Sequence, residues 1–109
     1  MINSNEIRME DTGSAPHLIC PRCGGNNLHH EIVILYARHE DANVVIETAV
    51  SRTFVESVET DGSDNPSRRR DGLAICFSCE ECGEGLQLTI AQHKGSSEIA
   101  WRFSPKSDL

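Results

Sequence analysis

The chain has 109 residues, of which 38% are hydrophobic and 5% aromatic, and its formal net charge is −7. This length allows one domain with a modest core, and a core of that size often needs a staple such as a metal ion. No apolar run approaches the roughly 18 residues that a membrane-spanning helix needs, and no secretory signal is visible. The acidic charge disfavours general DNA binding, which depends on neutralised phosphates, and favours a protein partner with a basic surface.

Residues 1–17 are polar and lack a clear period. We expect them to form a disordered tail. The folded domain is predicted to span residues 18–104, and residues 105–109 are expected to form a second tail.

The next two segments predict a β-hairpin. Leu28–His39 is rich in β-branched and aliphatic residues, and the turn-like tetrad Glu40–Asn43 separates it from Val44–Val55. The second segment alternates and places four apolar residues on one face: Val44, Ile46, Val50 and Phe54. A helix over Leu28–His39 is the alternative, because its apolar residues also fit spacings of three and four. The β-branched content and the missing N-cap favour the strand.

The second half predicts a mobile loop, a strand and a second hairpin. Glu56–Gly72 is rich in turn-forming residues, and we expect it to be a mobile loop. Leu73–Cys79 is predicted to be a short strand. Leu86–Ala91 and Glu98–Phe103 both alternate, and the polar turn Lys94–Ser97 lies between them.

The clearest chemical motif is a pair of Cys-x-x-Cys-Gly sequences, which contain Cys20 and Cys23, and Cys79 and Cys82. In each, the glycine permits the positive φ that a metal knuckle needs. Two such knuckles predict a tetrahedral site of four thiolates, which suits structural Zn²⁺. Iron in a rubredoxin-like site and redox dithiol chemistry are the alternatives. A site closed by four cysteines has no open coordination position, so we expect no enzyme activity.

The cysteines also bear on charge and compartment. An odd number of cysteines, without a visible signal, favours metal thiolates in a reducing compartment, and we expect a cytoplasmic protein. Four thiolates with one divalent ion would add two negative charges, for a total of about −9.

The order of these motifs resembles the zinc-ribbon class: CPxCG, a hairpin insert, a short strand, CxxCG and closing strands, from Cys20 to Phe103. The resemblance, which extends to small zinc-ribbon proteins of bacteria and phages, implies a mostly-β zinc ribbon with two hairpins and an enlarged insert. Zinc ribbons serve as transcription-factor modules, ribosomal proteins and subunit scaffolds. We therefore expect a protein-interaction or scaffold module, and a transcription-complex or nucleic-acid-associated module is the alternative.

Cys76 forms a further Cys-x-x-Cys with Cys79, but only the pair Cys79 and Cys82 ends in glycine. We therefore predict that Cys76 is a small buried hydrophobe, with an alternative ligand or a redox-sensitive thiol as the other readings. His29 and His30 are neighbours on a predicted strand, so they point to opposite faces and cannot easily bind one ion.

Two charged motifs can each be interpreted either as ordinary solvent-exposed residues or as a functional site. Arg68, Arg69 and Arg70 form the only basic cluster, which is either a solvated loop or a contact for nucleic acid or an acidic protein patch. Glu40 and Asp41, at the predicted hairpin tip, are similar to the acidic pair in the zinc ribbons of transcript-cleavage elongation factors, which hold a catalytic Mg²⁺. The order Glu-Asp, the preceding histidine and the longer insert depart from that family. The alternative interpretation is that two acidic residues at a hairpin tip serve only solubility.

Overall fold

The computed structural model describes residues 7–103 except 12 and 14, and this part of the chain is built from β-strands. The strands are β1 (Met9–Asp11), β2 (Pro16–Leu18), β3 (Leu28–Ala37), β4 (Val45–Val50), β5 (Val55–Thr60), β6 (Gly72–Cys79), β7 (Gly83–His93) and β8 (Ser96–Phe103). Within the described residues there is no helix, and so none that could cross a membrane.

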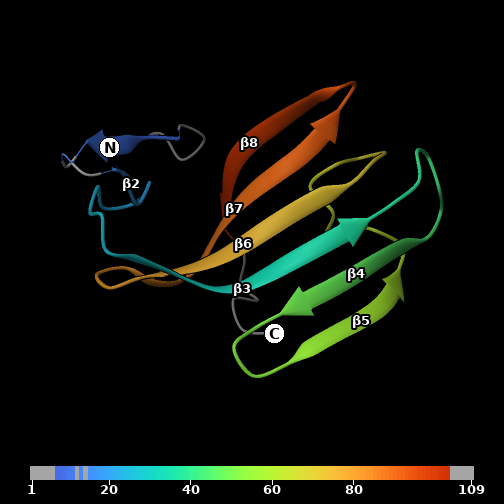
Figure 1. Cartoon of the computed structure of the whole chain (residues 1–109), viewed down its shortest axis with the longest axis horizontal. Helices are drawn as coiled ribbons and strands as arrows, with labels where there is room; N and C mark the ends of the chain where they lie inside the picture. Colours follow the sequence, from blue (N-terminus) through green and yellow to red (C-terminus); the bar gives the residue numbers. More distant parts are fainter. Residues whose placement is uncertain (1–6, 12, 14, 104–109) are drawn as a thin grey trace.

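Six strands form one antiparallel sheet in the order β5-β4-β3-β6-β7-β8, and β1 pairs with β2 in a separate two-stranded sheet (Figure 1). The mostly-β prediction is therefore confirmed, whereas the predicted pair of hairpins is in fact one continuous sheet. The sheet consists of two three-stranded meanders, joined where β3 pairs with β6.

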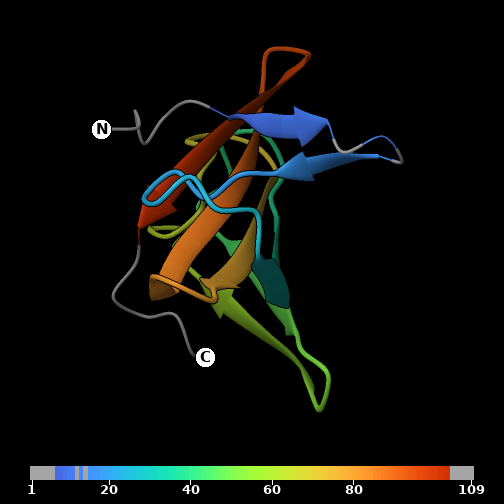
Figure 2. The same ribbon diagram turned by 90° about the vertical axis from the view of Figure 1, so that its left-hand side faces the viewer.

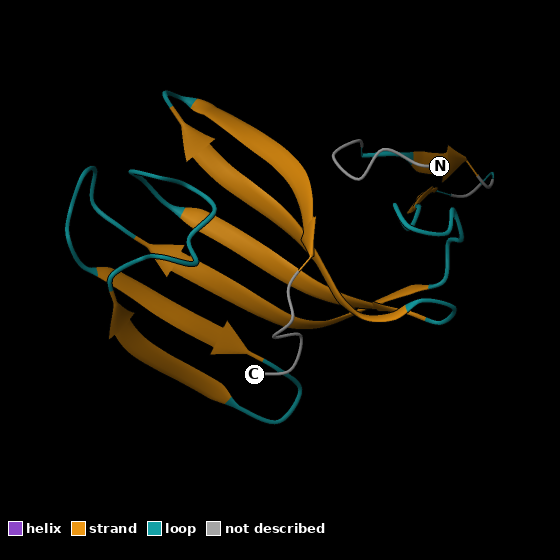
Figure 3. Cartoon of the chain, turned by 180° about the vertical axis from the view of Figure 1, so that it is seen from behind, coloured by secondary structure: helices purple, strands orange, loops and turns teal. Residues whose placement is uncertain are grey.

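The connection of residues 61–71 leads from the edge strand β5 to the central strand β6, and it crosses one face of the sheet (Figure 3). Gly62 lies against Val45, and Ser67 is buried, where its hydroxyl donates to the carbonyl of Gln92 at 2.9 Å. Arg102 also reaches this connection, donating to the carbonyl of Asp64 at 2.8 Å. The expected mobile loop over Glu56–Gly72 is thus wrong for residues 56–60, which belong to β5, and for Gly72, which begins β6. The residues between them are anchored to the sheet.

The first hairpin differs from its prediction at its second strand. Leu28–Ala37 is a strand, not a helix, as its β-branched residues favour. The segment Val44–Val55, however, divides into β4 and the start of β5, with a turn at residues 51–54 between them. The buried residues of β4 are Val45 and Ala49, so the predicted apolar face is the exposed one. The cause is the crossing connection, which covers the opposite face.

The second hairpin forms as predicted, with strands longer than the alternation indicated. Lys94 and Gly95 both have positive φ, at 50° and 86°. This is the combination that a two-residue type I′ turn requires, and its twist matches the flanking strands.

The buried residues form two clusters. The first lies under the crossing connection and contains Ile32, Ile34, Tyr36, Val45, Ala49, Ala74 and Cys76. The second contains Cys20, Cys79, Leu86 and Trp101. Ile7 and Leu18 pack against the second cluster, which joins the β1–β2 hairpin to the sheet (Figure 2).

The expected N-terminal tail needs a correction. Residues 9–11 and 16–18 form the two strands of a hairpin. Residues 1–6, 12, 14 and 104–109, including the expected tail at 105–109, lie outside the described residues.

Candidate metal centre

The structure brings the four predicted ligands together. The sulfur atoms of Cys20, Cys23, Cys79 and Cys82 all lie within 4.8 Å of one another. The Sγ atoms of Cys23 and Cys79 are 3.6 Å apart. A regular tetrahedron with Zn–S bonds of about 2.3 Å has sulfur–sulfur edges of roughly 3.8 Å. The spacing and the all-sulfur donor set therefore suit a metal ion such as Zn²⁺.

Strand pairing explains why cysteines far apart in the sequence meet. The first knuckle leads directly into β3, whose first residue, Leu28, pairs with Cys79 at the end of β6. Cys79 also pairs with Gly83, so the second knuckle is the tight turn between β6 and β7. The end of the β3–β6 pair thus places both knuckles at one corner of the sheet.

Backbone geometry shapes each knuckle around its sulfurs. The N–H groups of Arg22 and Gly25 donate to the sulfurs of Cys20 and Cys23, each at 3.4 Å. The glycine after each Cys-x-x-Cys, Gly24 and Gly83, has positive φ, at 79° and 89°. The expected role of these two glycines is therefore confirmed, because other residues rarely adopt this conformation.

The close packing of the thiols shifts their pKa values in different directions. Burial alone raises the pKa of Cys20, but the backbone N–H groups of Cys23 and Arg22 outweigh it, and its pKa falls to about 7. The N–H of Gly25 lowers the pKa of Cys23, but burial and the neighbouring sulfurs raise that pKa to about 12. The charge of one thiolate in this group therefore opposes ionisation of its neighbours. A divalent cation would remove this repulsion, because it stabilises all four thiolates together.

Arg22 connects the first knuckle to the last two strands, a role that no sequence pattern predicted. Its guanidinium donates to the carbonyls of Gly83 and Glu84, at 3.4 and 3.3 Å, and lies 5.5 Å from the ring centre of Phe103. These contacts hold Cys20 and Cys23 against the second knuckle independently of the sulfurs.

The nearby histidines do not join the sulfur cluster. His29 lies 2.6 Å from a carboxylate oxygen of Glu80, and both side chains are exposed. His30 packs edge-on against Phe77. Among the described residues, the four cysteines are the only group of three or more Cys, His, Asp or Glu side chains gathered closely enough to hold an ion.

Cys76 is buried in the other cluster, away from the four sulfurs, as expected for a small hydrophobe. Its sulfur accepts a hydrogen bond from the amide of Gln87 at 3.5 Å, and burial raises its pKa. The side-chain oxygen of Gln87 in turn accepts a hydrogen bond from the guanidinium of Arg102 at 2.6 Å. Arg102 also donates to the hydroxyl of Tyr36 at 3.4 Å, which completes a polar network inside the first cluster.

The two charged motifs from the sequence meet each other. Arg69 binds both carboxylate oxygens of Asp41, at 2.6 and 2.8 Å, and Arg70 binds Glu40 at 2.7 Å. The Arg69 guanidinium lowers the pKa of Asp41. The acidic pair is therefore engaged with arginines and is not presented freely to Mg²⁺. The sequence could not show this pairing, because it depends on the path of the crossing connection.

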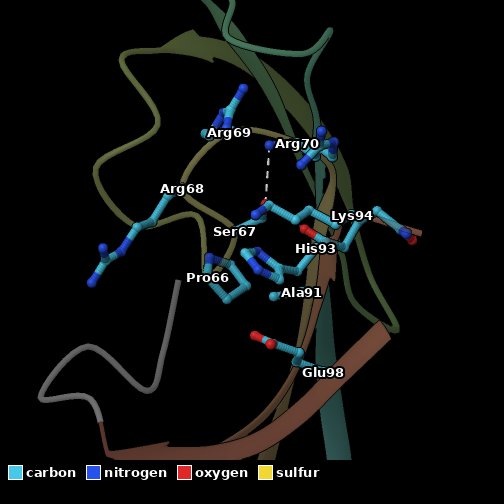
Figure 4. A pocket seen from close by; sticks show the side chains of 10 residues that line it. Pro66, Ser67, Arg68, Arg69, Arg70, Ala91, His93, Lys94 and Glu98 are labelled. Carbon is cyan, nitrogen blue, oxygen red and sulfur yellow. Dashed lines mark hydrogen bonds between the residues drawn. The ribbon is translucent and has the colours of Figure 1, made fainter. Parts of the chain in front are cut away.

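The arginine segment also lines a cavity of about 440 Å³, with Pro66 and Ser67 on one side and Ala91, His93, Lys94 and Glu98 on the other (Figure 4). The backbone N–H of Arg70 donates to the hydroxyl of Ser67 at 3.0 Å, which fixes the bend of this segment. The cavity gathers several cations, but Glu98 also lines it, and Arg69 and Arg70 are already paired with acids.

Comparison of the chain with protein-family models, curated proteins and solved structures finds no match. The similarity to zinc ribbons therefore rests on the cysteine motifs and on the four-sulfur cluster.

Proposed function

We propose that this protein is a β-sheet module stabilised by a structural Zn²⁺ ion, and that it acts by binding another protein. The clustering of four cysteine sulfurs at one corner of the sheet is the observation that carries this proposal. A tetrahedral set of four thiolates is typical of structural Zn²⁺, and iron is the main competitor. With four protein ligands, the ion would have no open position for a substrate, which supports a structural role.

The ion would supply folding energy where the fold has little of its own. The β1–β2 hairpin has mostly exposed residues, and the first knuckle connects this hairpin to β3. A metal shared by both knuckles would fasten the N-terminal segment to the end of the central strands. The odd number of cysteines and their Cys-x-x-Cys-Gly motifs favour metal thiolates over disulfides, which supports a reducing, cytoplasmic setting for the protein.

Charge supports a basic protein as the partner. The chain carries −7, and two of its arginines, Arg69 and Arg70, are paired with acids. The acids of β5 and the following turn, among them Glu56, Glu59 and Asp61, are exposed. Such a surface attracts a basic partner, and the attraction weakens as salt screens it.

A transcription-complex or nucleic-acid-associated role is the second candidate, and the cavity beside Arg68 and Lys94 favours it. A gel-shift series with random-sequence duplex DNA and single-stranded RNA tests it, with Arg68→Ala as the variant. A shift at low salt that this variant reduces would support the role. No shift by the parent protein at low salt would exclude it.

Native mass spectrometry with and without a chelator tests the metal. We expect one zinc ion per chain, lost on chelation, and none in a Cys79→Ser variant. A protein that carries iron, or that carries no metal after purification with zinc supplied, would overturn the zinc proposal.

For the partner, the probes are a lysine-rich peptide and a matched glutamate-rich peptide. Binding of the lysine-rich peptide alone, weakened by salt, is expected. Failure of that peptide to bind at low salt would contradict a basic partner.

A further inference from the structure

The six-stranded sheet has two faces that the chain treats differently. The connection of residues 61–71 covers one face, where Tyr36 and Val45 are buried. The opposite face carries two rows of side chains that are neighbours in the strand pairing. The first row is Thr48, Leu35, Leu73, Ile90 and Ile99, and the second is Val50, Val33, Ile75, Leu88 and Trp101. Because paired residues project to the same side of a sheet, these rows form one surface, which we call the apolar face.

The apolar face is partly open: of its ten residues, three are exposed, six are half-buried and Trp101 is buried. Relative exposure is 47% for Leu35, 51% for Ile99 and 37% for Val50. The N-terminal segment covers one end, where Ile7 and Leu18, like Leu88, pack against the buried cluster that contains Trp101. Soluble monomers rarely leave a contiguous apolar surface of more than a few hundred Å² exposed. The apolar residues of these strands alternate as they do on a sheet face that is covered. The monomer, however, leaves part of this face exposed.

We infer that the apolar face is the interface of a symmetric homodimer, in which the sheets of two copies of this chain pack face to face. Sheets pack in this way at a distance of about 10 Å, with their side chains interdigitated. A two-fold axis through the face would set each row of one protomer against the same surface of its partner. Leu35 and Leu73, on the two central strands, would lie near the axis.

The size of the face suits this arrangement. The whole face of the sheet, with six strands about 4.8 Å apart and roughly eight residues per strand at about 3.3 Å, spans on the order of 700 Å² in projection, and the two apolar rows form its middle. A standard stable interface takes about 800 Å² from each partner. A dimer would therefore use most of this sheet face, with the apolar rows at the centre and polar side chains at the rim.

Charge favours a second copy over other occupants. Neither row of the apolar face contains a charged residue, and Glu59, which projects to the same side, lies outside the rows on the edge strand β5. Two chains that each carry −7 can therefore bring their apolar rows together without placing like charges at the centre of the interface. The end segments of the chain are a poor cover, because residues 1–6 and 104–109 include Met1, Ile2 and Leu109 as their only large apolar side chains.

The sheet edges are less suited to association. The edge strand β5 carries Glu56 and Glu59, and the edge strand β8 carries Glu98. Charged residues on an edge oppose strand-to-strand pairing with another chain. The open face therefore remains as the surface for self-association.

Sedimentation equilibrium at micromolar concentrations tests the dimer, using the zinc-loaded chain. We expect twice the mass of the 12.0 kDa chain for the parent protein. Leu35→Lys should raise the dissociation constant by about 30-fold or more, the size of a hot-spot effect, because it places two cations near the axis. Val58→Lys is the matched control, since Val58 is similarly exposed at 54% but pairs with Glu47, on the other face. This control should leave the dissociation constant within about threefold, as expected of a residue outside the interface.

A second variant guards against misfolding. Ile99→Lys changes the outer part of the face and should also weaken the dimer, while circular dichroism shows that both variants keep the sheet. A monomeric parent protein would overturn the inference, as would a dimer that Leu35→Lys and Ile99→Lys leave intact. The inference goes beyond the proposed function, and native mass spectrometry counts metal ions and subunits separately. The failure of one therefore does not decide the other.

Discussion

Two cysteines on β6, Cys76 and Cys79, lie three positions apart in opposite surroundings. Cys79 belongs to the four-sulfur group, whereas Cys76 is buried in the other cluster beside Gln87. We predict that Cys79→Ser abolishes metal binding and unfolds the domain, because structural zinc provides about 10–16 kcal/mol. Cys76→Ser should keep the metal and cost about 1–2 kcal/mol, because the hydroxyl can still accept from Gln87. Metal content by mass spectrometry and urea unfolding check both. A Cys76→Ser protein without metal would show that the ligand set is wrong.

The ionisation of Tyr36 makes the stability of the first cluster depend on pH in the alkaline range. Burial raises its pKa to about 12, with the Arg102 guanidinium acting in the opposite direction. A raised pKa in the folded state means that folding favours the neutral phenol. Its contribution is therefore full below pH 10, the unfolded value, and is lost as the pH rises towards 12.

The matching variant is Tyr36→Phe, which keeps the ring and removes the titrating hydroxyl. The free energy of unfolding of the parent protein should fall by about 2 kcal/mol more than that of the variant between these two pH values. Cys76, whose pKa is also raised, titrates in both proteins and cancels in the difference. Equal losses in both proteins, measured by urea unfolding, would contradict the role given to Tyr36.

At the scale of elements, the connection between β5 and β6 depends on glycine at a close approach. Gly62 has φ of 80°, and a Cβ there would lie 2.6 Å from Cγ2 of Val45. Gly62→Ala should therefore cost about 1–2 kcal/mol for the left-handed backbone and a further 1–3 kcal/mol for overpacking. Gly95→Ala is the control, because Gly95 has a similar φ of 86° with no atom within 4 Å of the added Cβ. Equal destabilisation of the two variants in thermal melts would show that the connection does not press on β4.

The elements that the sequence revealed are those with buried side chains. β3 and β7 each pack at least one face against the core, and β8 contributes the buried Trp101, although its Ile99 is exposed. β5 gave no such signal, because five of its six residues are exposed and it contributes mainly backbone hydrogen bonds to β4. The β1–β2 hairpin was missed for the same reason. The four cysteines were found because glycine and spacing encode a knuckle locally, whereas the contact between Arg69 and Asp41 depends on the path of the crossing connection.

For the whole molecule, the metal centre and the sheet are one cooperative unit. Cys20 and Cys79 of the four-sulfur group share a cluster with Trp101 and Leu86, and β3 and β6 contribute to both clusters. The expected contribution of zinc, about 10–16 kcal/mol, is at least as large as the whole stability of a typical domain, about 5–15 kcal/mol. Chelation should therefore unfold the sheet and not merely loosen its corner.

The single tryptophan makes this measurable. Trp101 packs edge-on against Phe77, in the cluster that contains Cys20 and Cys79, so its fluorescence reports on the metal corner. Far-ultraviolet circular dichroism reports on the six strands. During titration with a chelator, we expect both signals to change together, and added Zn²⁺ to restore them. Mg²⁺ should not restore them, because it prefers oxygen ligands. A fluorescence change with unaltered circular dichroism would mean that the two clusters hold the sheet without the metal.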